Sequence, residues 1–353
     1  MNFYYNILLF VLVLFLYIHI IHQYKRSEDL EIYEADYSSN TQLQEICDIK
    51  QPVLFNYKSI NPEFYDAITY DNLSVASYSN YDIRIKESAD YWETDDTVDF
   101  VVLPFSSGIN LMKSDPKGAY FTENNEEFIE ESGLTSFWNK NDDFLKPNFI
   151  VYTKYDIMSG SRESCTPLRY HTNFRHYLSV NSGKIRVKMT PWKSRKHLEI
   201  KYDYEYYEFW SPINIWKNPP DKIRCLEFDV KEGFVIYIPA YWFYSIEFPN
   251  HNISVASFTY STTMNMVSNL PNYTLFFMQQ NNIKNLVNTQ NVKNVYSSKE
   301  NISNTDENIE RTEEINGKER EQDTERIQEK EKDNESKEIE KMLSVITKTD
   351  QNP

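Results

Sequence analysis

Cysteine is scarce in this 353-residue chain, and basic residues are outnumbered by acidic ones. The three cysteines, Cys47, Cys165 and Cys225, lie far apart, and no CxxC pair or zinc-ligand spacing occurs. We therefore expect reduced thiols, as in a domain that faces the cytosol, and no disulfide framework or structural zinc. Lys and Arg number 37 against 53 Asp and Glu, which gives a net charge of −16. Because phosphate binding needs clustered Lys and Arg, no nucleic-acid partner is expected.

Glycine is also rare, with 7 residues, whereas Tyr (27) and Phe (21) are abundant. No Walker loop and no GxGxxG, GxSxG or HExxH motif occurs. Each of these motifs positions a phosphate, a nucleophile or a zinc ion through a fixed spacing. Their absence gives no support to nucleotide-binding, α/β-hydrolase or zinc-protease functions.

The first 24 residues carry no charged side chain, and residues 7–18 are almost continuously apolar. Residues 3–22 would form roughly 30 Å of helix, which is enough to cross a bilayer. A cleaved signal peptide would have a basic start and small residues at the cut site, and this segment has neither, so an uncleaved anchor is favoured. Lys25 and Arg26 follow the span. The positive-inside rule then predicts a single-pass membrane protein with a cytosolic C-terminal domain.

Composition divides the rest of the chain into three parts. Residues 25–40 are polar and acidic and are predicted to be a tether, and residues 41–285 hold the apolar patterns of a folded domain. Residues 286–353 are predicted to be a disordered charged tail, with 16 acidic and 8 basic residues between 300 and 341. The tail is interpreted as a solvated spacer or, alternatively, as a segment that binds a protein partner.

Within the folded part, short apolar strands separated by turns predict a barrel or sandwich, mainly β with flanking helices. The clearest strands are expected at 175–180, 184–189, 226–230, 234–238, 242–248 and 253–260. A buried strand is predicted at 99–105, a strand from residue 52, and helices at 41–49, 124–134 and 273–283. The aromatic run 202–210 is interpreted as one core or interface strand, or as a platform for a carbohydrate or peptide.

Three segments carry a family resemblance: LQEICDIKQPVLF at 43–55, TPLRYHTNFRHYLSVNSGKIRVKMTPW at 166–192, and EGFVIYIPAYWFYSIEF at 232–248. In order and separation they resemble the cupin-like proteins of the JmjC and asparaginyl-hydroxylase type, and within that group the divergent cupin-like proteins of large DNA viruses. The resemblance covers roughly residues 30–285. It implies a cupin-type double-stranded β-helix, or jelly roll, and in the active members Fe(II)- and 2-oxoglutarate-dependent oxygenase chemistry.

The family holds Fe(II) with two histidines and a carboxylate on one face of the ion. At the matching positions this chain has Arg169, His171 and Tyr244. A guanidinium has no lone pair to donate, and an unperturbed phenol is neutral at pH 7. We therefore expect no metal, no cofactor and no catalytic residue at these positions. An alternative set of His197, Glu199 and His251 has the wrong separation along the chain for the ligand strands of this fold.

Lys184 and Arg186 match the family strand that binds the co-substrate. Together with Arg169, and with Arg175 as a further candidate, they are candidates for an anion-binding pocket. The alternative is that Arg169 pairs with a core carboxylate such as Glu227 or Asp229.

Three functions remain open at this stage. The favoured one is a membrane-anchored, catalytically inactive cupin-like protein that acts as a binding or structural module, with partners at its tail or aromatic surface. The second is an Fe(II)/2-oxoglutarate-dependent hydroxylase with shifted ligands, and the third is a structural protein of a virion or membrane.

Overall fold

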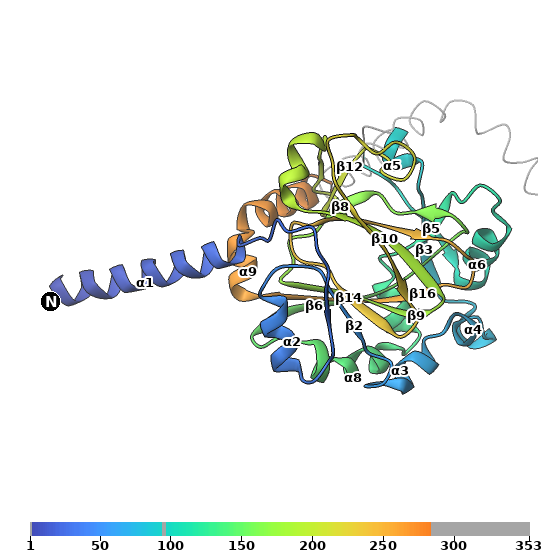
Figure 1. Cartoon of the computed structure of the whole chain (residues 1–353), viewed down its shortest axis with the longest axis horizontal. Helices are drawn as coiled ribbons and strands as arrows, with labels where there is room; N and C mark the ends of the chain where they lie inside the picture. The colour runs from blue at the N-terminus through green and yellow to red at the C-terminus, as the bar shows by residue number, and fades with distance from the viewer. Residues whose placement is uncertain (1, 94–96, 284–353) are drawn as a thin grey trace, which may run out of the picture. The chain divides into compact units, whose positions relative to one another are not determined.

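The computed structural model describes residues 2–93 and 97–283. Two β-sheets form most of it, which confirms the prediction of a mainly β chain with flanking helices (Figure 1). The larger sheet has nine strands in the order β1-β2-β14-β9-β16-β6-β5-β3-β4, and the smaller has seven, with β11-β12-β8-β15-β10-β13 in order and β7 beside β15. All strand pairs are antiparallel except β1 and β2, which are parallel.

The strands of the larger sheet are β1 (Tyr33–Ala35), β2 (Val53–Asn56), β3 (Asp82–Glu87), β4 (Val101–Pro104), β5 (Tyr120–Thr122), β6 (Ile150–Gly160), β9 (Arg175–Ser182), β14 (Phe234–Tyr237) and β16 (Ser254–Thr262). Those of the smaller sheet are β7 (Ser164–Cys165), β8 (Leu168–Tyr170), β10 (Lys184–Thr190), β11 (Lys201–Asp203), β12 (Glu208–Ser211), β13 (Leu226–Lys231) and β15 (Phe243–Phe248). The helices are α1 (Asn2–Gln23), α2 (Asn40–Cys47), α3 (Pro62–Ala67), α4 (Tyr70–Leu73), α5 (Asp90–Glu93), α6 (Phe105–Ser114), α7 (Glu126–Glu131), α8 (Thr135–Leu145) and α9 (Thr263–Ser268), with two 3-10 turns, η1 (Ala76–Tyr78) and η2 (Trp192–His197). A further helix spans 270–283.

The chain passes repeatedly from one sheet to the other. β9 and β10 are joined by the predicted turn at 181–183, yet they lie in different sheets, and the same holds for β13 and β14. Gly183 and Gly233 turn the chain at these crossings with φ of 79° and 90°, a conformation that favours glycine. The two crossings are held together, because the Glu232 N–H donates to the Gly183 carbonyl at 3.0 Å. The sheets are therefore fastened to each other along one edge.

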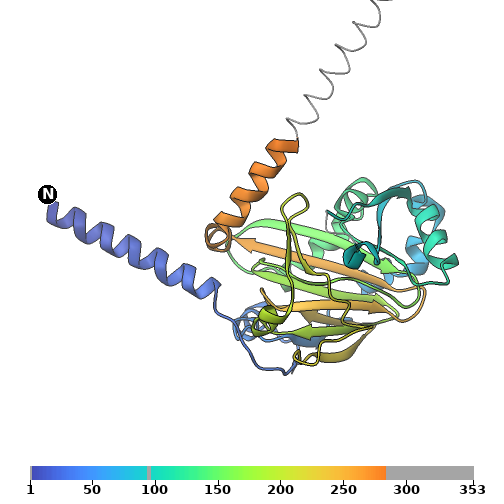
Figure 2. The same ribbon diagram turned by 90° about the horizontal axis from the view of Figure 1, so that it is seen from above.

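Three apolar clusters account for the core. Alternating residues of the strands face either the opposite sheet or the outer layer, as the two-residue period of a strand requires. The inter-sheet core includes Leu178 and Val255 from the larger sheet and Val187 and Ile246 from the smaller one, all fully buried. A second cluster lies between the outer face of the larger sheet and helices that include α2, α3 and α8. A third lies on the outer face of the smaller sheet. Figure 2 shows the strands of the sheets side by side, with the helices between residues 60 and 145 gathered at one end of them.

Two local predictions were wrong. The strand at 99–105 is not buried, because β4 is the edge strand of the larger sheet and leaves Val101 61% exposed. The run at 202–210 is not one strand but the hairpin β11–β12, whose turn ends at Tyr207 with a φ of 58°. Within the predicted tether at 25–40, β1 pairs with β2. The predicted tail at 286–353 lies outside the described residues.

The inter-sheet core is expected to dominate stability. Replacement of the fully buried Ile246 by Ala removes apolar contacts and leaves a cavity, which should lower the free energy of unfolding by about 2–5 kcal/mol. Val101→Ala, on the exposed edge strand, is the control and should change it by less than about 0.5 kcal/mol. Urea unfolding of the full chain in detergent, followed by tryptophan fluorescence, measures both. Equal effects of the two changes would contradict this assignment of the core.

Candidate functional site

The positions that the resemblance links to metal binding meet between the two sheets. Arg169 on β8 and Tyr244 on β15 are 75 residues apart in sequence but are register partners in the smaller sheet. The Arg169 guanidinium carbon lies 5.6 Å from the centre of the Tyr244 ring. His171, which follows β8, has its ring centre 6.2 Å from that of Tyr244 and 4.7 Å from that of His176 on β9. Arg169, His171 and Tyr244 therefore form one buried centre, with His176 as its fourth member.

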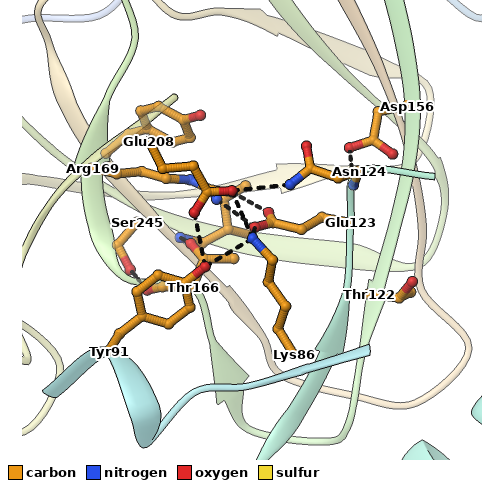
Figure 3. Close-up of polar contacts among 12 residues, drawn as sticks. Lys86, Tyr91, Thr122, Glu123, Asn124, Asp156, Thr166, Arg169, Glu208 and Ser245 are labelled. Atoms are coloured by element: carbon orange, nitrogen blue, oxygen red, sulfur yellow. Dashed lines mark hydrogen bonds and ion pairs between the residues drawn. The ribbon is translucent and has the colours of Figure 1, made fainter. Parts of the chain in front are cut away.

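Arg169 belongs to a buried ionic network that also contains Lys86, Tyr91, Glu123 and Glu208 (Figure 3). Its guanidinium binds both carboxylate oxygens of Glu123, with an Nη1–Oε1 distance of 2.6 Å. The Lys86 ammonium donates to Glu123 at 3.2 Å, to Glu208 at 2.6 Å and to the Tyr91 hydroxyl at 2.9 Å. The Tyr91 hydroxyl donates to the second oxygen of Glu208 at 3.0 Å. Two cations thus face two carboxylates.

The network joins the two sheets. Lys86 lies on β3, and Glu123 directly follows β5, both in the larger sheet. Arg169 on β8 and Glu208 on β12 come from the smaller sheet. The side chains of Lys86 and Glu123 are 2% and 3% exposed, so these charges have almost no water to stabilise them. Their stability in the core depends on each other.

The loop that carries Glu123 is fixed by a second carboxylate. Asp156 on β6 accepts hydrogen bonds from the backbone N–H groups of Asn124 and Asn125 at 2.8 and 2.7 Å. Asn124 adopts the left-handed conformation with a φ of 61°, which Asn tolerates better than most residues. Its side chain donates to Glu208 at 3.0 Å and accepts from Lys154 at 2.8 Å. Glu123 is therefore held in place by backbone as well as side-chain contacts.

The electrostatics follow from burial and pairing. Burial opposes ionisation of Glu123, but Arg169 and Lys86 outweigh it and lower the pKa of this carboxyl to about 2. Burial likewise opposes the charge of Arg169, yet Glu123 raises its pKa above the ordinary value. Burial opposes the charge of Lys86 too, and its carboxylate and phenol partners raise its pKa above the ordinary value. Glu123, Arg169 and Lys86 are therefore ionised at neutral pH.

The two histidines are neutral. The His171 Nε2–H donates to the Ile238 carbonyl at 3.0 Å, and burial lowers the pKa of this imidazole to about 4. His176 contacts the Thr259 hydroxyl through Nδ1 at 2.9 Å, and burial lowers its pKa well below the usual value. Burial also raises the pKa of Tyr244, which stays a neutral phenol.

These side chains do not fit the family's Fe(II) site. Arg169 cannot donate a lone pair, and its charge is satisfied by Glu123. The Nε2–H group of His171 already donates a hydrogen bond to the Ile238 carbonyl, so this nitrogen offers no lone pair. Across residues 2–93 and 97–283, no three His, Cys, Asp or Glu side chains gather in a way that would hold a metal ion.

The candidate anion-binding residues do not converge. Lys184 and Arg186 lie on the outer face of β10, where both contact Asp229, at 2.9 and 3.4 Å. Arg175 binds Asp48 at 2.6 Å on the opposite sheet. The carboxylate partner of Arg169 is Glu123 rather than Glu227 or Asp229, because Arg169 faces the interior whereas β13 exposes both of those residues.

The alternative set does not converge either. His197 and Glu199 line one surface hollow, and His251 lines another with Lys113 and Arg162. Sequence reasoning also missed Lys86, Tyr91, Glu123 and Glu208, which complete the ionic network. The alternation of β3 would place Lys86 on the polar face beside Arg84, and no motif in the sequence distinguishes the two.

Glu123 is expected to be the most sensitive residue of the network. Glu123→Gln leaves Arg169 and Lys86 buried without one carboxylate, which should lower the free energy of unfolding by about 3–5 kcal/mol. Glu127→Gln, whose side chain is 73% exposed and contacts Arg84 at 3.0 Å, is the matched control and should cost less than about 1 kcal/mol. Urea unfolding at pH 7 measures both variants. If Glu123→Gln lowers the free energy of unfolding no more than Glu127→Gln does, the network does not stabilise the fold.

The histidines predict a pH dependence. The pKa of His171 is about 4 in the folded protein and near 6.5 in the unfolded chain. The contribution of the neutral ring to the free energy of unfolding is therefore complete above pH 6.5 and is lost as the pH falls toward 4. His171→Asn keeps a donor and should remove about 1.4 kcal/mol per pH unit from the slope of unfolding free energy across that range. The exposed His251→Asn is the control. An unchanged slope in His171→Asn would mean that the ring is solvated. Below pH 4.5, protonation of Glu123 adds a further loss toward pH 2.

Comparison with known protein sequences gives no family for this chain. The sequence matches no protein-family model and no curated protein sequence. Any functional assignment therefore depends on the three sequence segments, the strand arrangement and the chemistry of the buried centre.

Proposed function

We propose that this chain is a membrane-anchored, cupin-type protein in which a buried ionic network has replaced the family's Fe(II) site, and that it acts as a binding or structural module. The single observation that carries the proposal is the pairing of Arg169 with Glu123 between the sheets. A salt-bridged guanidinium stands at the first metal-ligand position, and a neutral phenol stands at the third.

The strand arrangement supports a double-stranded β-helix. Strands β9, β10, β13, β14, β15 and β16 are distributed between two facing sheets, with three in each. The residues that the motif alignment assigns to the first and third ligand positions, Arg169 and Tyr244, are register partners. An alignment that was wrong by one residue would have placed one of them on the opposite face of its strand.

The anchor is supported by length and composition. Residues Phe3–Gln23 form a helix long and apolar enough to cross a membrane, and its apolar window is not buried against the rest of the chain. Lys25 and Arg26 lie two and three residues beyond its end. The positive-inside rule then favours a cytosolic domain.

One of the two alternatives has a specific basis. The proximity of His171 and His176, with ring centres 4.7 Å apart, favours a hydroxylase with shifted ligands, for which a third ligand would have to come from rearrangement. A structural protein of a virion or membrane differs from the proposed module mainly in its partner. The charged tail that would distinguish them lies outside the described residues.

Anaerobic titration of the full chain in detergent with Fe(II) and 2-oxoglutarate, followed by succinate release in air, tests the proposal. We expect no stoichiometric iron and no succinate, because Arg169 repels a divalent ion and offers no lone pair. One iron per chain that is lost in His171→Ala or His176→Ala, with succinate formed by the parent protein, would make the chain an oxygenase. His251→Ala, at the surface, is the control for nonspecific iron binding.

A further inference from the structure

The end of the folded domain contains a long uncharged segment. Residues 263–283 hold no Asp, Glu, Lys, Arg or His, in a chain of which 25% is charged. They form α9 and the helix at 270–283. Surface helices of soluble proteins carry charged residues on their solvent face, so this composition calls for an explanation.

One face of this segment packs on the domain. The Tyr273 ring stacks on Tyr207 with centres 4.9 Å apart, and Phe276 contacts the same ring edge-on at 5.6 Å. The Gln280 amide donates to the Glu205 carbonyl at 2.7 Å. These contacts settle which side of the helix faces the protein.

The side of the helix next to this face is apolar and exposed. Leu270, Phe277 and Met278 are 60%, 66% and 58% exposed, and their separations of seven and eight residues place them on one side of the helix at 270–283. Val267, near the end of α9, is 39% exposed. We call these four residues the apolar stripe. Their free energy would be lower in an apolar environment, by about 25 cal/mol for each Å² removed from water.

The stripe adjoins the end of the membrane-spanning helix. The Tyr24 hydroxyl, one residue beyond the apolar span, donates to the Ser268 carbonyl in α9. The Tyr24 ring also lies 6.1 Å from Tyr241, whose hydroxyl donates to Asn269 at 3.0 Å. Because Tyr24 marks the point where α1 leaves the lipid, residues that contact it lie at the level of the headgroups.

Basic residues surround the same point. Arg26 lies over the rings of Trp192 and Tyr241, at 4.4 and 4.2 Å. Lys193, Arg195 and Lys196 follow Trp192 and are exposed. Residues 24–28 and 192–199 together hold five Lys or Arg against two Glu, although the whole chain has a net charge of −16. Glu28 contacts Lys193, and its backbone carbonyl accepts from that ammonium at 3.0 Å.

We propose that the folded domain lies on the surface of the membrane that α1 enters. The stripe of Val267, Leu270, Phe277 and Met278 inserts at the boundary between headgroups and acyl chains, and Lys193, Arg195 and Lys196 contact anionic headgroups. This inference rests on the proposed role of α1 as an anchor. A lipid bilayer is favoured over a protein partner because the stripe is continuous with α1, and because the charge around it is opposite in sign to that of the chain.

The test is site-specific photocrosslinking of the full chain in vesicles that contain anionic and neutral phospholipids. A benzophenone amino acid at Phe277 should form lipid adducts. The same group at Val101, which is equally exposed (61%) on β4, should form none. β4 leads directly into α6, which lies at the end of the domain away from α1 (Figure 1). A third position, Leu12 within α1, reports on the anchor itself.

The outcomes separate the two proposals. Lipid adducts at Leu12 and Phe277 but not at Val101 support surface docking. Lipid adducts at Leu12 alone overturn docking and leave the anchor proposal intact. A crosslink from Phe277 to a second copy, or to another segment of this chain, does the same. No lipid adduct at 12 overturns the anchor.

The role of charge is tested in the same assay. The triple change Lys193→Gln, Arg195→Gln, Lys196→Gln should reduce the adduct yield at 277 on the order of tenfold in anionic vesicles. The control is the triple change Lys113→Gln, Lys117→Gln, Lys140→Gln at exposed positions elsewhere on the surface. It removes the same charge and should leave the yield of lipid adducts at Phe277 unchanged. Equal yields from the two triple variants would contradict the assigned headgroup contact.

Discussion

Two cations and two carboxylates lie between the sheets, with side chains 2–14% exposed, and they pair with one another. Transfer of an unpaired charge into such a place costs several kcal/mol, so the four groups have to be buried together. Because Lys86 and Glu123 belong to one sheet and Arg169 and Glu208 to the other, they reach their partners only when the sheets have met in the correct register. Burial of an ion pair adds little stability compared with apolar packing, and its main effect here is to make other alignments of the sheets unfavourable.

The same interaction bears on the chemistry of the centre. Around it, three side chains that could act on a metal or a proton are each held in one state: Glu123 by Arg169, His171 by the Ile238 carbonyl, and Tyr244 by burial. A general acid or base needs a pKa near the working pH, and these groups lie far from it. An interior of this kind is suited to holding a fold together, which agrees with the proposed binding or structural role.

Sequence reasoning recovered those parts of the fold that depend on local patterns. The turns at Gly183 and Gly233 and the strands beside them follow from apolar alternation and from the need for glycine at positive φ. The assignment of opposite sheets to β9 and β10 did not follow, because a turn of this length also suits a hairpin. The exposure of β4 was missed because an apolar edge strand has the same composition as a buried one.

The candidate site was only half predictable for a related reason. Motifs placed Arg169, His171 and Tyr244 together, since the three positions are linked through known strand spacings. Lys86, Glu123 and Glu208 come from strands outside those motifs, and a charged residue on a strand is far more often solvated than buried. The pairing of Lys184 and Arg186 with Asp229 similarly depends on which face of β10 points outward, and that face is set by packing of the whole sheet.

The position of β16 in the larger sheet has a consequence for how the protein is made. Among the described residues this strand is the last along the chain, yet it lies in the middle of the sheet, between β9 and β6. Until its residues have left the ribosome, β9 and β6 have no common neighbour and their edges stay unpaired. Contacts between such distant segments form slowly, and unpaired strands are prone to aggregate. The proposed anchor precedes the folded domain along the chain, and it would hold the growing chain at the membrane, apart from other copies, during that interval.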